Sequence, residues 1–289
     1  MSQLAPLSRS VWPAVNDLAL NVHYVQVGPW RTRVLEVGEG EPLVLMHGSG
    51  GHLEAYMLNL EFLSQHFRVI AFDCPGHGYT TLATEDLELD TYEEHLLGLL
   101  DALGIERAHL DGESLGGWLA IKFAVHHPER VARVVTNTPG GTMANPVVME
   151  RIRNLSQAAA DDPSYERIRA RLEWLMADSS SVTDELVEIR RGIYSQPGFS
   201  ESMKRILCLQ DPEIRQRNLI TDDELARVQA PTLVLWTSDD PSGPAKAGQE
   251  MADKIPGGEF AFIEGAGHWP QWEQTEQFNK LMLSFLGAQ

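Results

Sequence analysis

Short apolar runs rich in β-branched residues recur along the chain and alternate in its first half with longer segments of helical period. Runs this apolar suit strands that are covered on both faces, and their alternation with helices is typical of a mostly parallel sheet. The pattern therefore predicts the α/β class, with a central sheet flanked by helices. The predicted strands span residues 22–27, 33–37, 43–46, 68–72, 108–110, 131–136, 232–236 and 260–263.

The pattern changes between Pro139 and about Leu209, where charged and apolar residues alternate at helical spacing without a strand-like run. A structureless loop of this length would be unusual inside a compact domain. We therefore predict a helical cap inserted between two strands of the sheet. The predicted division places the first part of the core at residues 1–139, the cap at 140–209 and the second part of the core at 210–289.

The size and charge of the chain narrow the classes of partner. With 289 residues, the chain is long enough for one complete core and one inserted subdomain. The 41 acidic residues against 23 basic ones give a formal net charge of −18, which would repel phosphate backbones and anionic membranes. We therefore expect a small-molecule substrate and neither nucleic acid nor a membrane as partner. An anionic substrate would need a local cationic anchor.

Neither a targeting segment nor a metal site stands out in the sequence. No stretch approaches the roughly 20 apolar residues of a membrane helix, and residues 1–10 lack the charged start and apolar run of a secretory signal. We therefore expect a cytoplasmic protein. Cys74 and Cys208 are too few for a disulfide framework or a four-ligand zinc site. Since no His-Glu-x-x-His motif occurs either, we predict that the protein uses no metal and no cofactor.

The segment 110–118 carries the most specific motif. It reads Leu-Asp-Gly-Glu-Ser-Leu-Gly-Gly-Trp, so that Gly-x-Ser-x-Gly lies between a predicted strand and a helical pattern that starts at Leu115. A tight strand-to-helix turn at this place projects the serine hydroxyl above the sheet, and the two glycines let backbone pass close to the turn. We predict that Ser114 is a nucleophile that attacks a carbonyl carbon.

The glycine-rich segment 47–51, His-Gly-Ser-Gly-Gly, follows an earlier predicted strand. Such a loop can turn backbone N–H groups toward a point beside the serine hydroxyl, and so can the free N–H groups at a helix start. We predict an oxyanion hole built from the amides of Ser49 and Leu115, with Gly48 and Gly50 beside the substrate. A phosphate-binding loop is excluded because no Gly-Lys-Ser/Thr follows.

A serine nucleophile needs a base, and His268 is the best placed of the 10 histidines. It follows the predicted strand 260–263 and a flexible Glu-Gly-Ala-Gly segment. The acid should follow the predicted strand 232–236, where Asp239 and Asp240 are both available. Asp240 has the better spacing, and we predict that it orients the imidazole and stabilises its cationic form. Asp239 is the alternative.

Four segments together resemble the α/β-hydrolase superfamily. They are residues 47–51, 73–78 (Asp-Cys-Pro-Gly-His-Gly), 112–117 and 267–279. The last segment, which begins Gly-His-Trp-Pro-Gln-Trp-Glu, is more specific. With residues 190–197 of the predicted cap, it resembles the meta-cleavage product hydrolases, which cut a carbon–carbon bond in ring-opened aromatic compounds. The resemblance implies the α/β-hydrolase fold and suggests a homodimer.

For an enzyme of that family, the resemblance implies a 2-hydroxy-6-oxohexa-2,4-dienoate as substrate. The serine–histidine pair would first aid ketonisation of the dienol, and cleavage of the C5–C6 bond would give 2-hydroxypentadienoate and a carboxylic acid. The resemblance also implies that a cap arginine binds the dienoate carboxylate and that the tryptophan after the base lines the pocket. These residues are Arg190, with Arg191 as the alternative, and Trp269.

Two positions depart from the pattern of that family. The residue before the nucleophile is commonly Asn and is Glu113 here. Its carboxylate would either change the charge near the dienoate or point away into a salt bridge. An Asn shortly after the oxyanion loop is matched by Asn59 only with a shifted gap. We include Glu113 and Asn59 among the expected substrate contacts.

The sequence leaves other functions open. A carboxylesterase or lactonase would use the same three residues through an acyl-enzyme and would need no cap arginine for a carboxylate. A haloalkane dehalogenase is disfavoured because Ser114, rather than Asp, stands at the nucleophile position. A hydrolase-fold receptor without catalytic activity is disfavoured by the complete set of Ser114, His268 and Asp240.

Overall fold

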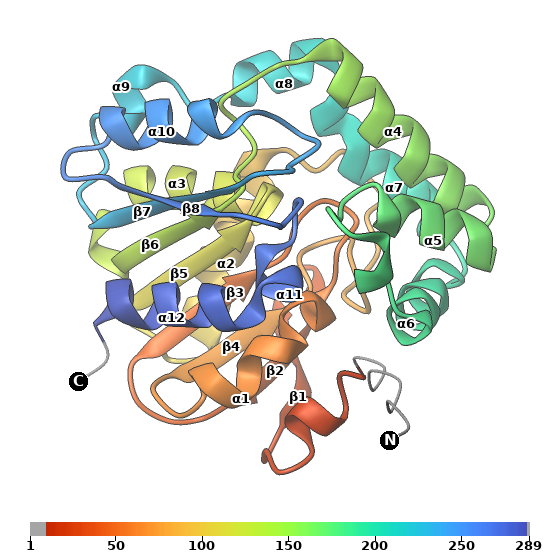
Figure 1. Cartoon of the computed structure of the whole chain (residues 1–289), viewed down its shortest axis with the longest axis horizontal. Helices are drawn as coiled ribbons and strands as arrows, with labels where there is room; N and C mark the ends of the chain where they lie inside the picture. The colour runs from red at the N-terminus through yellow and green to blue at the C-terminus, as the bar shows by residue number, and fades with distance from the viewer. Residues whose placement is uncertain (1–9, 288–289) are drawn as a thin grey trace, which may run out of the picture.

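The computed structural model describes residues 10–287, in which eight strands form one sheet with helices on both sides (Figure 1). The strands are β1 (Asn21–Val27), β2 (Trp30–Val37), β3 (Pro42–Met46), β4 (Arg68–Phe72), β5 (Ala108–Glu113), β6 (Val131–Asn137), β7 (Thr232–Thr237) and β8 (Glu259–Ile263). Their order in the sheet is β1-β2-β4-β3-β5-β6-β7-β8. β2 pairs antiparallel with β1 and β4, and the remaining pairs are parallel. The predicted α/β class, with a mostly parallel sheet, is confirmed.

The helices of the core pack against this sheet and against one another. α1 (Leu60–Leu63) contacts α12 (Thr275–Leu286), whereas α2 (Leu89–Ala102) contacts α3 (Leu115–His126) and β1. α3 also packs against β5 and β6, and α10 (Ala245–Lys254) packs against β7 and β8. Because both faces are covered, every residue of β5 and of β7 is buried.

Every element between β6 and β7 is a helix, and most of these helices lie over one end of the sheet (Figure 1). The α-helices are α4 (Pro146–Asp161), α5 (Tyr165–Glu173), α6 (Asp184–Tyr194), α7 (Phe199–Ile206), α8 (Pro212–Asn218) and α9 (Asp222–Leu225). α9 contacts α3 and α10 of the core. The helical run therefore continues past residue 209, and the boundaries of the cap stay a prediction. No helix within residues 10–287 is long and apolar enough to cross a membrane.

Short helical turns complete the chain. The 3-10 helices are η1 (Pro13–Val15), η2 (Leu53–Asn59), η3 (Pro128–Arg130), η4 (Ser179–Ser181) and η5 (Leu207–Gln210), and the remaining α-helix is α11 (Pro270–Glu273). Polar residues fix the starts of two cap helices. Asn145 accepts a hydrogen bond from the Val147 N–H at the start of α4, and Thr183 accepts one from the Leu186 N–H at the start of α6. These caps fix the residues at which α4 and α6 begin.

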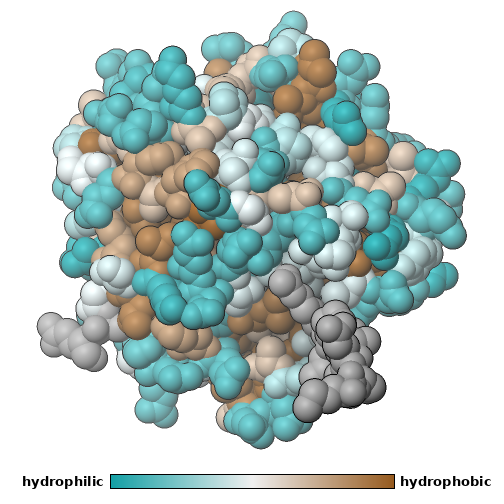
Figure 2. Space-filling view, viewed as in Figure 1, coloured by the Kyte–Doolittle hydropathy of each residue, from teal (hydrophilic) through white to brown (hydrophobic). Residues whose placement is uncertain are grey.

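β8 forms one edge of the sheet and is less covered than the central strands. Glu259 and Phe262 are exposed, and Phe260 and Ala261 are partly exposed. Figure 2 shows apolar residues gathered over this edge. The homodimer that the resemblance suggests stays a prediction.

The carboxylate of Asp73, directly after β4, joins three segments of the core. It accepts hydrogen bonds from the backbone N–H groups of Leu53 and Tyr79, both at 2.8 Å, and pairs with Arg33 of β2 at 2.6 Å. A Cβ atom at Gly78 would lie 2.0 Å from the Asp73 carboxylate. Asp73 therefore ties the segment after β3 to β2 and to the turn after β4.

We expect Asp73→Ala to lower the free energy of unfolding by about 3–5 kcal/mol, because breaking a buried ion pair strands the remaining charge. Urea denaturation followed by tryptophan fluorescence measures the change. The control is Asp86→Ala, which removes an exposed ion pair with Arg205 and should cost less than about 1 kcal/mol. Equal losses in the two variants would contradict this expectation.

Candidate active site

Ser114 stands in a strained turn between β5 and α3. Its backbone has φ +53° and ψ −107°, which is rare for a residue with a side chain. Cβ atoms at the neighbouring glycines would collide with backbone: one at Gly112 would lie 2.1 Å from Gly116, and one at Gly116 would lie 2.2 Å from the Met46 carbonyl oxygen. Both glycines are therefore required by the turn, which places Ser114 at the carboxyl end of the sheet.

Asp240 and His268 lie in the loops that follow the neighbouring strands β7 and β8, and their side chains meet. The His268 Nδ1 and Asp240 Oδ1 atoms are 2.9 Å apart. Asp240 also accepts hydrogen bonds from the N–H and the hydroxyl of Ser242, both at 2.9 Å. Asp239, the alternative acid, is exposed and accepts a hydrogen bond from Ser238 instead. The structure therefore brings Asp240, and not Asp239, to the imidazole.

Ser114 and His268 line one cavity beneath the cap. Within residues 10–287, the Ser114 hydroxyl and His268 Nε2 do not form a hydrogen bond in this structure. The lining residues come from the loops after β3, β5, β6, β7 and β8 and from the cap. They include Gly48, Ser49, Glu113, Ser114, Leu115, Trp118, Met149, Ile152, Arg171, Trp174, Leu175, Arg190, Gln210, Arg215, Ser242, His268 and Trp269.

Glu113 lies between the glycine-rich loop and the imidazole. Its Oε2 atom accepts a hydrogen bond from the Gly48 N–H at 2.7 Å, and its Oε1 atom is 3.3 Å from His268 Nε2. A Cβ atom at position 48 would lie 2.5 Å from the carboxylate, so the loop needs glycine at this point. Glu113 thus points into the cavity, and the imidazole lies between two carboxylates.

The two carboxylates change the ionisation of the imidazole. Burial lowers the pKa of His268, but the charge and hydrogen bond of Asp240 and the charge of Glu113 outweigh it and raise the pKa above its ordinary value. Burial raises the pKa of Glu113 above its ordinary value, although His268, the Gly48 N–H and Arg190 act in the opposite direction. Glu113 and His268 therefore titrate as an interacting pair.

We expect Glu113→Gln to make His268 titrate at a lower pH, because the substitution removes a negative charge that stabilises the imidazolium. NMR of the histidine side-chain nitrogens as a function of pH measures this shift. Glu93→Gln is the control, because Glu93 contacts His126 at 2.6 Å and should leave His268 unchanged. A His268 titration at an equal or higher pH in Glu113→Gln would contradict the expected coupling.

Arg190 of α6 enters the cavity as a buried cation. It is 1% exposed, and its Cζ atom lies 5.3 Å from the ring centre of Trp269 and 5.9 Å from that of Tyr194. Among the described residues, no carboxylate forms an ion pair with Arg190. The neighbouring Arg191, the alternative anchor, is exposed and pairs with Glu188 at 3.0 Å. The helix face therefore places Arg190, and not Arg191, in the cavity.

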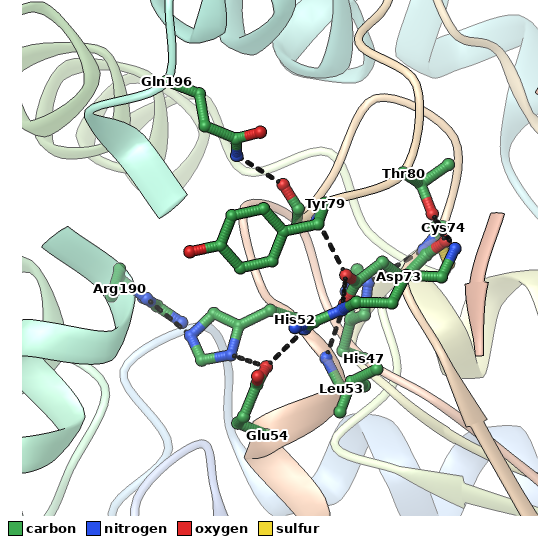
Figure 3. Close-up of polar contacts among 12 residues, drawn as sticks. His47, His52, Leu53, Glu54, Asp73, Cys74, Tyr79, Thr80, Arg190 and Gln196 are labelled. Carbon is green, nitrogen blue, oxygen red and sulfur yellow. Dashed lines mark hydrogen bonds and ion pairs between the residues drawn. The ribbon is translucent and has the colours of Figure 1, made fainter. Parts of the chain in front are cut away.

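His52 positions Arg190 through a chain of polar contacts (Figure 3). The Arg190 Nε–H points at His52 Nε2 at 3.5 Å, and His52 Nδ1 lies 2.9 Å from Glu54, which also contacts Arg33. Burial lowers the pKa of His52, so that its ring is neutral. A neutral ring that donates from Nδ1 to Glu54 leaves the Nε2 lone pair free to face the guanidinium.

The other expected site residues differ in whether they line the cavity. Ser49 and Leu115 line it beside Ser114. Gly50 is not among the lining residues, and its carbonyl oxygen accepts a hydrogen bond from Tyr194 at 2.8 Å.

The structure corrects the expected position of Asn59. This residue is buried outside the cavity lining, and its side-chain N–H group contacts the Gln271 carbonyl oxygen and Asn279 Oδ1. It therefore connects η2 to the C-terminal helices α11 and α12. The sequence match at Asn59 required a shifted gap, and the side chain contacts the C-terminal helices instead of the cavity.

Three further residues line the cavity that were not predicted from the sequence: Arg171, Arg215 and Gln210. A signal for Arg171 was present in the periodicity of α5. It lies three residues after Ile168 and next to Leu172, and both of these are fully buried. A charged residue on the apolar face of a helix is expected to be inward-facing and in need of a partner.

Comparisons with known proteins add relatives over nearly the whole chain. Residues 41–275 match the family model of the alpha/beta hydrolase fold. The chain is 35% identical over 280 residues to a 2-hydroxy-6-oxononadienedioate/2-hydroxy-6-oxononatrienedioate hydrolase of Paraburkholderia phymatum, covering 93% of this chain and 91% of the relative. It is 32% identical over 295 residues to a 2-hydroxy-6-oxo-6-phenylhexa-2,4-dienoate hydrolase of Burkholderia cepacia, covering 99% of each.

A solved structure also shares the fold of this chain. A meta-cleavage product hydrolase from Pseudomonas fluorescens superimposes with a TM-score of 0.80 and 31% sequence identity. The match covers 92% of this chain and 97% of that chain. The fold and the cavity described above are therefore built on a backbone that a solved structure shares over most of its length.

Proposed function

Because the chain belongs to the α/β-hydrolase family, and within it to the meta-cleavage product hydrolases, we propose that it cleaves the C5–C6 bond of a 2-hydroxy-6-oxohexa-2,4-dienoate. The products are 2-hydroxypentadienoate and a carboxylic acid. The observation that carries this proposal is a buried Arg190 without a carboxylate partner, in the same cavity as Ser114 and His268. An anionic substrate supplies the missing partner.

In this proposal Ser114 is the nucleophile, His268 the base and Asp240 the group that orients the base. The hydrogen bond between Asp240 and Nδ1 fixes the tautomer of His268, which directs the lone pair of Nε2 into the cavity. The backbone N–H groups of Ser49 and Leu115 stabilise the oxyanion. Ser49 and Leu115 both line the cavity with Ser114, which supports this assignment.

Arg190 and Trp269 hold the dienoate end of the substrate. The guanidinium binds the C1 carboxylate, and it stacks near the Trp269 ring, which is 1% exposed. Arg190 thus provides the cationic anchor that the formal net charge of −18 makes necessary.

The reaction then needs only groups that line the cavity. The dienol first loses the proton of its 2-hydroxyl group and gains one at C5, which converts it to a ketone. The Ser114 oxygen adds to the C6 carbonyl as His268 takes the hydroxyl proton. The C5–C6 bond breaks, its electron pair leaves with C5 as the dienolate, and the dienolate oxygen takes the proton held by His268 to give 2-hydroxypentadienoate. His268 then takes a proton from the water molecule that attacks the acyl group and returns it to the Ser114 oxygen as the carboxylic acid leaves. The sum of these steps is the addition of one water molecule across C5–C6.

We expect Ser114→Ala to lower kcat/KM for 2-hydroxy-6-oxo-6-phenylhexa-2,4-dienoate by at least about 1000-fold, because it removes the nucleophile. Loss of the yellow dienolate absorbance measures the reaction. A p-nitrophenyl ester is assayed beside it, since a carboxylesterase or lactonase would use the same serine. Ester hydrolysis without bleaching of the dienoate, lost in Ser114→Ala, would replace the proposed function with that alternative.

We expect Arg190→Ala to raise KM for the same dienoate by about 10- to 100-fold, because one charge-assisted contact to the carboxylate is lost. The neutral p-nitrophenyl ester should be much less affected. Arg191→Ala is the matched control, since it removes an exposed arginine from the same helix. An equal effect of the two arginine substitutions on KM would contradict the role proposed for Arg190.

A further inference from the structure

Glu113 is a buried carboxylate that faces the proposed base inside the cavity. It is 2% exposed, and it lines the cavity together with Ser114 and His268. Its Oε1 atom lies 3.3 Å from Nε2 of His268, the nitrogen that the proposed reaction uses. In the described part of the chain, no lysine or arginine forms an ion pair with Glu113. The partner of this carboxylate is therefore a group that itself gains and loses protons.

The glycine-rich loop fixes the direction in which this carboxylate points. The Gly48 N–H donates to Oε2 of Glu113 at 2.7 Å, and a Cβ atom at position 48 would lie 2.5 Å from Oε1. One carboxylate oxygen is thus held by the backbone, while the other faces the imidazole of His268. Oε1 can therefore take up a proton without loss of the hydrogen bond that positions the side chain.

The proposed reaction requires two proton transfers before Ser114 can attack. The 2-hydroxyl group must lose a proton and C5 must gain one, and these atoms lie at opposite ends of the dienol. His268 must then be neutral, because it takes the proton of the Ser114 hydroxyl. Although burial lowers the pKa of His268, Asp240 and Glu113 together raise it above its ordinary value. The imidazolium must therefore lose its proton before the attack.

A substrate bound as proposed extends along both groups. With C1 on Arg190 and C6 at Ser114, carbons C2 to C5 lie in the part of the cavity that Glu113 and His268 also line. Burial raises the pKa of Glu113 and the charge of Arg190 acts in the opposite direction, so these two side chains interact. The 2-hydroxyl group, which is next to the C1 carboxylate, therefore comes to Glu113. C5, which is next to C6, comes to the imidazole that serves Ser114.

We propose that Glu113 is a catalytic residue of ketonisation: its carboxylate takes the 2-hydroxyl proton while the His268 imidazolium donates its Nε2 proton to C5. The O–H electron pair forms the C2 carbonyl, the C2=C3 pair moves to C3=C4, and the C4=C5 pair binds the proton at C5. This step leaves Glu113 protonated and His268 neutral, as the attack by Ser114 requires. After the acid has left, Glu113 returns its proton to Nε2 across the 3.3 Å contact.

The cycle ends with the pair in its starting state, so no proton is gained or lost by the protein. The later steps use His268 as described above, and Glu113 keeps its proton through them. This inference rests on the proposed function and assigns a residue to its first step. It also gives a role to the carboxylate at the position where the family that the chain resembles commonly has Asn.

The other charged groups near the pair are less suited to this role. Asp240 binds Nδ1 of His268, on the side of the ring away from Glu113. Arg171 and Arg190 are cations that act on the charge of Glu113. Asp111, two residues earlier on β5, is completely buried and is not among the lining residues, and burial raises the pKa of its carboxyl to about 8. Glu113 is therefore the carboxylate that the substrate can reach.

The first test compares a substrate that needs ketonisation with one that does not. Glu113→Gln keeps an acceptor for the Gly48 N–H but cannot carry a proton. We expect it to lower kcat for 2-hydroxy-6-oxo-6-phenylhexa-2,4-dienoate by about 100-fold. Hydrolysis of a p-nitrophenyl ester, measured at the pH optimum of each variant, should fall by less than about 3-fold. Equal losses on both substrates would assign Glu113 to the geometry of the site and overturn the inference.

A second test follows ketonisation alone. Ser114→Ala lacks the nucleophile, so in D2O reversible ketonisation replaces the hydrogen at C5 by deuterium, which NMR of the recovered dienoate detects. We expect this exchange to be about 100-fold slower in Ser114→Ala/Glu113→Gln. Asp111→Asn in the same background is the matched control, because it changes a buried carboxyl of the same strand outside the cavity lining. It should leave exchange within about 2-fold, and an equal effect of the two substitutions would overturn the inference.

The pH dependence decides if Glu113→Gln does not fold. Exchange in Ser114→Ala uses the imidazolium, so its rate should fall as the pH rises through the pKa of His268. Ester hydrolysis by wild type uses the neutral imidazole and should rise over the same range. Two rates that rise together would overturn the inference. If wild type forms no 2-hydroxypentadienoate from the dienoate, the proposed function itself is wrong, whereas cleavage at the wild-type rate by Glu113→Gln removes only the role of Glu113.

Discussion

The turn from β5 into α3 holds Ser114 at φ +53°. This turn requires glycine at positions 112 and 116, because the backbone at Gly112 lies against Gly116 and the backbone at Gly116 lies against the Met46 carbonyl group. This constraint fixes more than the direction of one hydroxyl group. It brings the end of β3 against the start of α3, so that the loop containing Gly48 and Ser49 lies beside the Leu115 N–H. The strain of the turn is borne by the buried strands on either side, β3 and β6, which are hydrogen-bonded to β5.

The same turn determines the position of Glu113. As the last residue of β5, it must point into the crowded space between Gly48 and His268, where its carboxylate accepts one N–H and faces one imidazole nitrogen. A neutral amide at this place could make the hydrogen bond to Gly48 without altering the charge of the base. The carboxylate instead couples the protonation of His268 to the charge that enters the cavity, because an anionic ligand and Glu113 both favour the imidazolium. His268 therefore keeps its proton to a higher pH than an imidazole with a single carboxylate neighbour would.

The sequence predicted the parts of the molecule that depend on local patterns. Apolar runs gave all eight strands, and the Gly-x-Ser-x-Gly motif gave the turn, because both follow from residues that are adjacent in the chain. The choice between Asp239 and Asp240, and between Arg190 and Arg191, depends on which way one side chain of a neighbouring pair points, and only the fold decides that. Asn59 was wrongly assigned to the cavity on a sequence match with a shifted gap, whereas its buried side chain contacts Gln271 and Asn279. Arg171 was missed because its hydrogen-bond partner, Ser156, belongs to a different helix, and because the cavity that it lines is formed by segments that are distant in the sequence.

The polar and charged residues of the cavity come from two parts of the molecule. The proposed catalytic residues Ser114, His268 and Asp240 stand on loops of the sheet, whereas the cations Arg171 and Arg190, which form no ion pair among the described residues, stand on α5 and α6 of the helical insertion. In a chain with a formal net charge of −18, these two buried cations leave positive charge in the cavity that no protein carboxylate neutralises by an ion pair among the described residues. A ligand carboxylate in the cavity would compensate that charge. In the proposed reaction, the free energy of binding the substrate carboxylate can therefore be used to position the reacting carbon, because Arg190 and Ser114 belong to elements that meet at this cavity.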